Sequence, residues 1–319
     1  MALPSRVNTY KYSFFTQSIP MWNSLPETVV KAKDLTAFKA GFKETESLLE
    51  KAIGQGHKIL NLSHRELTVI PDSLKKLKHV QILLLNDNQI IMPPVELVYL
   101  SRLRELCLDH NQLTLLPSGF GRLTNLKVLC LSHNNLGYLA SEICELVQLE
   151  ELWIINTQLM ALPADICRLK LLKKLSAGKN MITSLPDKIS GLVSLQWLSL
   201  RENHLSSLPS EFFKLPKLAH LDLNMNKFEE FPENLIGLVS LECLSLRGNC
   251  IKSLADNCVE GLPKLCKVDI RDNQVTLLPR QLEKLRIFVT AQSHECGDPH
   301  QEDNGLEVNV RKKLRQWTK

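Results

Sequence analysis

One unit of 23 residues recurs along most of this chain. The segments that begin at Leu103 and Leu195 share the pattern L-x-x-L-x-L-x-x-N-x-L-x-x-L-P-x-x-F-x-x-L. Ten units lie in this register, with a step of 23 residues except for one step of 24 before the last unit. The units begin at His57, Val80, Leu103, Leu126, Leu149, Leu172, Leu195, Leu218, Leu241 and Leu265. A unit this short cannot bury its own apolar side chains, so the pattern predicts stacked units around one continuous core.

Each unit is expected to open with a short strand. The stretch L-x-x-L-x-L has a two-residue apolar period, which is typical of a strand with one buried face. An Asn follows at the ninth position, where its amide can bond backbone groups exposed at a turn, and stacked units would align these side chains into a buried ladder. The Asn residues are Asn88, Asn111, Asn134, Asn180, Asn203, Asn226, Asn249 and Asn273. Arg65 and Thr157 replace it in two units, and the Thr hydroxyl can supply only part of the amide's bonding.

The second half of each unit is expected to return on the outer side of the sheet. Pro follows the fourteenth position in eight units, and because Pro lacks an N–H it does not belong in a central strand. An apolar residue and a Leu then follow three residues apart, as in Ile143 and Leu146. This spacing predicts a short helical turn.

These residues together carry the leucine-rich repeat signature. The L-P-x-x-I-x-x-L form resembles the short cytosolic class that includes Ras-binding scaffold proteins and plant intracellular Ras-group proteins. The resemblance covers about 57–288 and implies an α/β leucine-rich repeat solenoid, a horseshoe with ten repeats and a parallel β-sheet on its concave face. It implies a protein partner, for which a small GTPase or a kinase or phosphatase complex is the first class to test. The cysteine-rich flanking caps of extracellular members are missing, which favours a cytoplasmic location.

Three regions are expected: an N-terminal extension (1–53), the repeat domain (54–288), and a polar linker with a short basic amphipathic tail (289–319). Residues 10–45 resemble the segment that closes many non-LTR retrotransposon reverse-transcriptase reading frames, through stretches such as W-N-S-L-P and L-T-A-F-K. The alternative is a genuine N-terminal cap, in which Asp34 begins a helix that runs to about Ile53. In the tail, Val310, Leu314 and Trp317 would share one helix face, as a cap on the last repeat, a frayed end, or a contact with a partner or a membrane surface.

Composition excludes several classes of function. The net charge of +5 is modest, so we expect no nucleic-acid binding. We find no apolar run long enough for a transmembrane span and no apolar signal-peptide region at the start. Nine cysteines without a C-x-x-C pair predict reduced thiols, including Cys107 and Cys130 on adjacent strands. His110 and His133 recur near Asp109, but repetition alone explains them, so no metal, cofactor or enzymatic activity is expected.

The concave face is the predicted binding surface, because positions 3, 5, 7 and 8 of each unit are not needed for the core. Trp153 and Trp197 are expected to project there, with Ile155 beside Trp153, as an exposed aromatic contact site. The alternative is that the two Trp side chains only cover their strand neighbours. Acidic residues precede this pair and basic residues follow it, which would favour a partner of opposite charge gradient.

The predicted partner-binding residues are Glu105, Asp109, Glu151, Trp153, Ile155, Lys174, Trp197, Arg201 and Arg247. The chain is thus predicted to be a non-catalytic interaction scaffold; a structural component of cilia or the cytoskeleton is the alternative.

Overall fold

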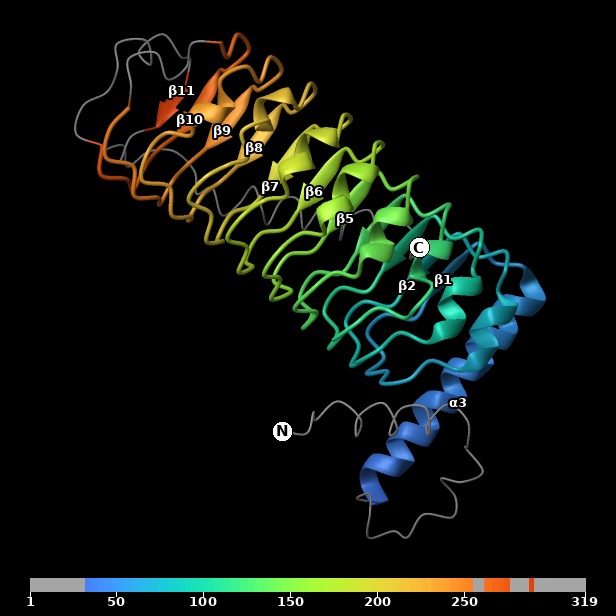
Figure 1. Ribbon diagram of the computed structural model, residues 1–319. Helices are drawn as coiled ribbons and strands as arrows, with labels where there is room; N and C mark the ends of the chain where they lie inside the picture. Colours follow the sequence, from blue (N-terminus) through green and yellow to red (C-terminus); the bar gives the residue numbers. More distant parts are fainter. Residues whose placement is uncertain (1–31, 255–260, 276–286, 290–319) are drawn as a thin grey trace, which may run out of the picture.

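The repeats form one solenoid with a parallel sheet along one face and short helical turns along the other (Figure 1). The computed structural model describes residues 32–254, 261–275 and 287–289, with side chains described for 42–254 and 261–275. In this part of the chain, eleven strands follow one another in sequence order, each paired with the next. They are β1 (Ile59–Asn61), β2 (Ile82–Leu84), β3 (Glu105–Cys107), β4 (Val128–Cys130), β5 (Glu151–Trp153), β6 (Lys174–Ser176), β7 (Trp197–Ser199), β8 (His220–Asp222), β9 (Cys243–Ser245), β10 (Lys267–Asp269) and β11 (Ile287–Val289).

The predicted period sets the register of the sheet. Each of β1 to β10 occupies positions 3 to 5 of one unit, so Leu106 of β3 pairs with Leu129 of β4, one unit later. The single step of 24 residues before the last unit also appears in the register of the sheet, because Leu244 pairs with Val268, 24 residues later. The ten predicted repeats are therefore confirmed as ten strands. β11 is an additional strand, and its sequence L-R-I-F-V-T has Phe and Thr where the L-x-x-L-x-L pattern has its second and third Leu.

The outer turns are 3-10 helices, which suits the apolar spacing of three residues. They are η1 (Asp72–Lys76), η2 (Val95–Tyr99), η3 (Phe120–Arg122), η4 (Ser141–Glu145), η5 (Ala164–Arg168), η6 (Asp187–Gly191), η7 (Phe212–Lys214) and η8 (Glu233–Leu235). Pro71 precedes η1 in an extended conformation, with φ −63° and ψ 147°. Ala140, which replaces Pro before η4, has nearly the same angles, φ −61° and ψ 143°. The pattern of the unit therefore directs the turn even where the Pro is missing.

The predicted Asn ladder is present in all eight units that carry the residue. Asn134 is typical: its Oδ1 accepts a bond from the Leu113 amide at 2.9 Å, and its Nδ2 donates to the carbonyls of Leu108 and Leu131 at 3.0 and 2.8 Å. Each Asn thus joins its own turn to the preceding unit. Seven of these Asn residues are almost fully buried and Asn273 is half-buried, so the bonds replace solvent for backbone groups that would otherwise be unsatisfied.

The two units without Asn have a different turn. Thr157 is fully buried and donates to the Ile154 carbonyl at 3.0 Å, which is one part of the bonding that an Asn provides. The residue after each replacement adopts a left-handed conformation: Gln158 has φ 62° and Glu66, after Arg65, has φ 54°. None of the tenth-position residues that follow an Asn has a positive φ. The amide of the ninth residue therefore sets the local backbone as well as the link between units.

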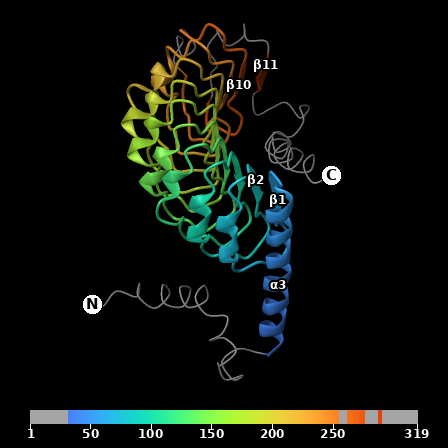
Figure 2. The ribbon, with the colours of Figure 1, turned by 90° about the vertical axis from the view of Figure 1, so that its right-hand side faces the viewer.

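A helix covers the first repeat. α3 (Ala32–Gln55) lies at the β1 end of the solenoid (Figures 1 and 2) and includes the helix that was expected from Asp34 to about Ile53. Leu49 and Ala52 are buried in the same core as the repeat leucines. The Ala52 carbonyl lies 3.2 Å from a ring nitrogen of His79. Side chains of α3 thus pack against the first repeat, whereas residues 1–31 and the predicted tail helix with Val310, Leu314 and Trp317 lie outside the described residues.

Candidate protein-binding face

The concave face carries an apolar layer of its own, separate from the repeat core. Four side chains at position 5 of adjacent strands are almost fully buried: Leu84, Cys107, Cys130 and Trp153. Partly buried apolar side chains pack against them: Ile82, Val128, Ile155 and Trp197. We call these eight residues the concave cluster. Adjacent strands in a sheet are only about 4.8 Å apart, so side chains in register touch and cover one another.

Trp153 is a supporting residue of this cluster and is only 4% exposed. The prediction that it faces solvent is therefore wrong. Its ring centroid lies 5.7 Å from that of Trp197, with the ring planes 35° apart. The two rings meet over β6, where the small Ser176 pairs in register with Trp153. The Trp153 Nε1 donates to Glu151 at 3.3 Å, which satisfies its polar atom.

Trp197 and Ile155 are the accessible side chains next to the buried Trp153. Both are half-buried, because each lies at the margin of the concave cluster. Trp197 stands at position 3 of β7, beside the exposed His220 of β8. The alternative in which the Trp residues cover their neighbours thus describes Trp153, whereas Trp197 retains a surface that another molecule can reach.

Most of the predicted charged residues have partners within the chain. Lys174 of β6 lies 3.2 Å from the Glu151 carboxylate on the preceding strand, β5. Arg201 is only 8% exposed and is held 2.8 Å from Glu202, so its prediction as an outward-facing contact is wrong. Arg247 is 2.6 Å from Asp272. The predicted acidic-to-basic gradient is therefore partly neutralised by local ion pairs. Two of the partners, Glu202 and Asp272, stand at position 8 of their units and were not among the predicted contacts.

Glu105 and Asp109 are the other predicted acidic contacts, and both are half-buried. Glu105 lies on β3, in register with Ile82 and Val128 of the concave cluster. Asp109 lies just after β3. The structure therefore brings these two carboxylates to the end of the face that precedes the Trp pair, as the sequence predicted.

Three residues at position 2, which directly precedes each strand, form a charged ladder across adjacent units. Glu150 lies 2.7 Å from the Lys127 ammonium and 2.6 Å from that of Lys173. The hydrogen bonds from Lys127 and Lys173 lower the pKa of Glu150 from 4.5 to about 2. Sequence analysis missed this ladder, although the alternation of Lys, Glu and Lys at 23-residue intervals was a signal for it.

The loops after the strands hold the eighth residue of each unit in the left-handed region. His110 and His133 have φ 52° and 57°, and their rings stack with centroids 4.2 Å apart. Asp, Asn, His and Gly tolerate this conformation better than branched residues, which explains their frequency at this position. The recurrence of His near Asp109 is thus a consequence of stacking units, as predicted.

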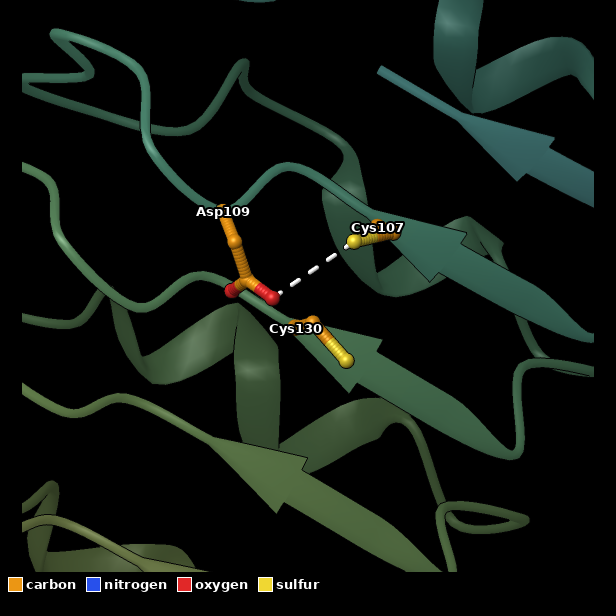
Figure 3. Close-up of side chains that lie close together, drawn as sticks. All are labelled: Cys107, Asp109 and Cys130. Atoms are coloured by element: carbon orange, nitrogen blue, oxygen red, sulfur yellow. Dashed lines mark hydrogen bonds between the residues drawn. The ribbon is translucent and has the colours of Figure 1, made fainter. Parts of the chain in front are cut away.

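Asp109 instead lies close to two thiols (Figure 3). Cys107 and Cys130 end β3 and β4, and the Cys107 Sγ lies 3.5 Å from the Asp109 Oδ2. The two Sγ atoms and one carboxylate oxygen of Asp109 all lie within 4.8 Å of one another. The hydrogen bond with Cys107, and then burial, hold the pKa of the Cys130 thiol well above its ordinary value. For the cysteines in the described ranges, the prediction of free thiols is confirmed; Cys258 and Cys296 lie outside those ranges.

Family models and solved structures agree with this fold. A model described as "Leucine-rich repeat region" matches residues 164–307, and a model described as "Leucine Rich Repeat" matches 102–123 and 125–146. The fold of this chain is a leucine-rich repeat solenoid. The stretch between the matches contains Thr157, where the Asn ladder is interrupted. The first two units precede the matched residues, but β1 and β2 continue the leucine-rich repeat sheet in register.

Three solved structures illustrate the similarity. A Leptospira interrogans leucine-rich repeat protein is 34% identical, with a TM-score of 0.70 over 75% of this chain and 62% of that chain. A TDR receptor is 25% identical, with a TM-score of 0.59 over 76% of this chain and 48% of that one. The plant peptide hormone receptor RGFR1, in complex with RGF2, is 26% identical, with a TM-score of 0.50 over 65% and 38%. The chain therefore spans less than two thirds of each. No match was found among curated proteins.

None of the helices in the described part of the chain combines the length and the apolar character that a membrane crossing requires.

Proposed function

We propose that this chain is a non-catalytic cytoplasmic scaffold that binds a protein partner on its concave face, with Trp197 and Ile155 at the centre of the contact. The observation that carries this proposal is the concave cluster. Stacking of the repeats requires the leucines that point into the core, but it does not require a second apolar layer on the opposite side of the sheet. An aromatic side chain at the margin of such a layer has the composition of an interaction hot spot.

The supporting layer gives the proposed contact its rigidity. Trp153 is buried against Trp197, so the Trp197 ring is held in place before a partner arrives. A side chain that is already ordered loses less conformational entropy on binding. Glu105 and Lys174 lie on β3 and β6 and Arg247 follows β9; these half-buried charges would contribute more to specificity and association rate than to affinity.

The partner class follows from the resemblance of the repeats to Ras-group proteins. A small GTPase or a kinase or phosphatase complex is the class that we propose to test first. The similar plant receptor is described as a peptide hormone receptor in complex with RGF2, which fits a proteinaceous ligand in this fold.

Affinity capture with the full-length chain from a cytosolic extract tests this proposal. We expect Trp197→Ala to reduce recovery of the specific partner at least tenfold, because it removes the accessible aromatic ring. Phe213→Ala is the matched control, since Phe213 is a 40% exposed aromatic residue on the outer η7 turn. Circular dichroism would establish that both variants are folded.

The recovered proteins also separate the alternatives. Enrichment of a small GTPase, or of kinase or phosphatase subunits, supports the signalling role, and direct binding of the purified GTPase in its GDP and GTP-analogue forms would follow. Recovery unchanged by Trp197→Ala would rule out the concave contact. Co-sedimentation with tubulin, without GTPase or kinase binding, would favour the cytoskeletal alternative.

We also propose that residues 10–45 derive from a transposon fragment joined to the repeats. Leu49 and Ala52, which are buried in the repeat core, follow this segment, whereas Glu44 within it lies 2.6 Å from Arg65 of the first repeat. RNA sequencing reads that span the codons near residue 50 would support a joined transcript. Their absence in tissue that expresses the repeats would contradict it.

A further inference from the structure

Cys107, Cys130 and Asp109 lie together on the concave face for a geometric reason. The two Cys residues occupy the same position of adjacent units and pair in register across β3 and β4. Asp109 comes two residues after Cys107, so its side chain returns to the same face of the sheet (Figure 3). Two thiols and one carboxylate thus converge from two neighbouring strand ends.

We propose that these three residues form a binding site for a thiophilic divalent cation such as Zn²⁺. Two sulfurs and one oxygen are ligands that Zn²⁺ accepts, whereas Mg²⁺ and Ca²⁺ prefer oxygen alone. Ligand atoms at roughly 2.0–2.3 Å from a tetrahedral ion lie roughly 3.3–3.8 Å apart. The three atoms already lie within 4.8 Å of one another, so small side-chain rotations bring them to that separation.

The surroundings favour a built site over a chance grouping. The Asp109 Oδ1 accepts a bond from the Ser132 amide at 2.6 Å, while its Oδ2 faces the Cys107 thiol. The backbone of the next unit thus orients the carboxylate, as partners beyond the ligands do in known metal sites. Cys107 and Cys130 are each only 2% exposed, beside Trp153, so bulk water is largely kept from the sulfurs.

Binding of the divalent ion would displace the protons of the two Cys thiols. Each thiol must lose its proton to bind the ion, so one M²⁺ ion releases two protons and forms two metal–sulfur bonds, with no change in oxidation state. Asp109 would supply the third ligand and water the fourth. The bound ion would connect the units that begin at Leu103 and Leu126 and would stabilise the concave cluster next to Trp153. The site does not depend on the proposed protein partner.

Titration of the reduced, metal-free full-length chain with Co²⁺ and Cd²⁺ tests the site. These ions give thiolate-to-metal charge-transfer absorption, and a weakly buffered solution with a pH indicator reports the released protons. We expect a charge-transfer signal that saturates together with two released protons per ion. The variants are Cys107→Ser/Cys130→Ser and Asp109→Asn, and Zn²⁺ competition gives the affinity.

A second thiol pair in the same chain provides the control. Cys243 and Cys266 also come from adjacent units, and Cys266 donates to a backbone carbonyl, but in the described residues the grouping of two thiols with a carboxylate is found at Cys107, Cys130 and Asp109. Cys243→Ser/Cys266→Ser is expected to retain the signal. Asp109→Asn, which keeps both thiols, is expected to weaken binding at least tenfold.

The outcomes are distinct. Loss of the signal in Cys107→Ser/Cys130→Ser, with retention in Cys243→Ser/Cys266→Ser, supports the site. A wild-type chain without charge-transfer absorption, or a signal that survives in Cys107→Ser/Cys130→Ser, overturns the proposal. If the double Ser variant fails to fold, Asp109→Asn and the proton count of the wild-type chain decide: unchanged affinity in Asp109→Asn or no released protons also overturns it. Partner capture plays no part in these measurements, so their failure is distinguishable from failure of the proposed function.

Discussion

At the scale of single residues, the ninth position of the unit has the largest effect on the structure. Asn134 bonds both to its own turn and to the preceding unit, and it is 3% exposed. Thr157 shows what happens when the amide is missing, because the next residue then adopts a left-handed backbone. The ladder is therefore a source of stability and also of local geometry.

Asn134→Ala should lower the free energy of unfolding by about 2–4 kcal/mol, because it leaves a buried amide and buried carbonyls without partners. Asn125→Ala is the control, since Asn125 is exposed and makes one bond, to the Ser101 carbonyl at 2.8 Å. Urea denaturation followed by circular dichroism measures both. Equal losses in the two variants would contradict the importance of the ladder.

Glu150 gives the folded chain a specific dependence on pH. Its folded pKa of about 2 lies below the ordinary 4.5, so its carboxylate stabilises the folded state fully above about pH 4.5. This contribution is lost as the pH falls from 4.5 towards 2. The side chain is 26% exposed, so solvent screening reduces its contribution to about 1 kcal/mol.

Glu150→Gln is therefore expected to cost about 1 kcal/mol at pH 7, and the difference from wild type should vanish near pH 2. Denaturation midpoints across this range measure the effect. Glu229→Gln, which removes the exposed pair with Lys252, should change stability little at any pH. A Glu150→Gln effect that persists unchanged at pH 2 would be inconsistent with this ladder.

At the scale of elements, the strands, the outer turns and the ladder could all be predicted because each depends on contacts that repeat every 23 residues. The concave face could be predicted only in part. Strand alternation places Trp153 on the correct face, but its burial depends on Trp197 lying two strands away, over the small Ser176. Arg201 is buried against Glu202 for a similarly local reason. Such contacts depend on the size and direction of individual side chains, which the 23-residue repeat pattern does not determine.

The capping helix α3 is a second element whose role can be tested. Leu49 is fully buried in the repeat core, so Leu49→Ala should cost about 2–4 kcal/mol. Because neighbouring units stabilise one another, hydrogen exchange should rise most in β1 and β2 and little in β8. Lys51→Ala, on the exposed side of the helix, is the control. Uniform exchange across the sheet in Leu49→Ala would refute a local capping role.

At the scale of the whole molecule, the solenoid separates stability from recognition. The core leucines and the Asn ladder hold each unit to the next, while the concave cluster lies on the opposite side of the sheet. Repeat proteins commonly use such extended concave surfaces for binding. A partner is therefore expected to cover the strand face and to leave the outer turns open.

Oxidative footprinting of the captured complex measures this directly. We expect a partner to protect Trp197 and the neighbouring His220 on the concave face. Met160 and Phe213, which are 67% and 40% exposed on other surfaces, should stay as reactive as in the free chain. Protection of Met160 or Phe213, with Trp197 and His220 still as reactive as in the free chain, would contradict the central claim that the concave face binds the partner.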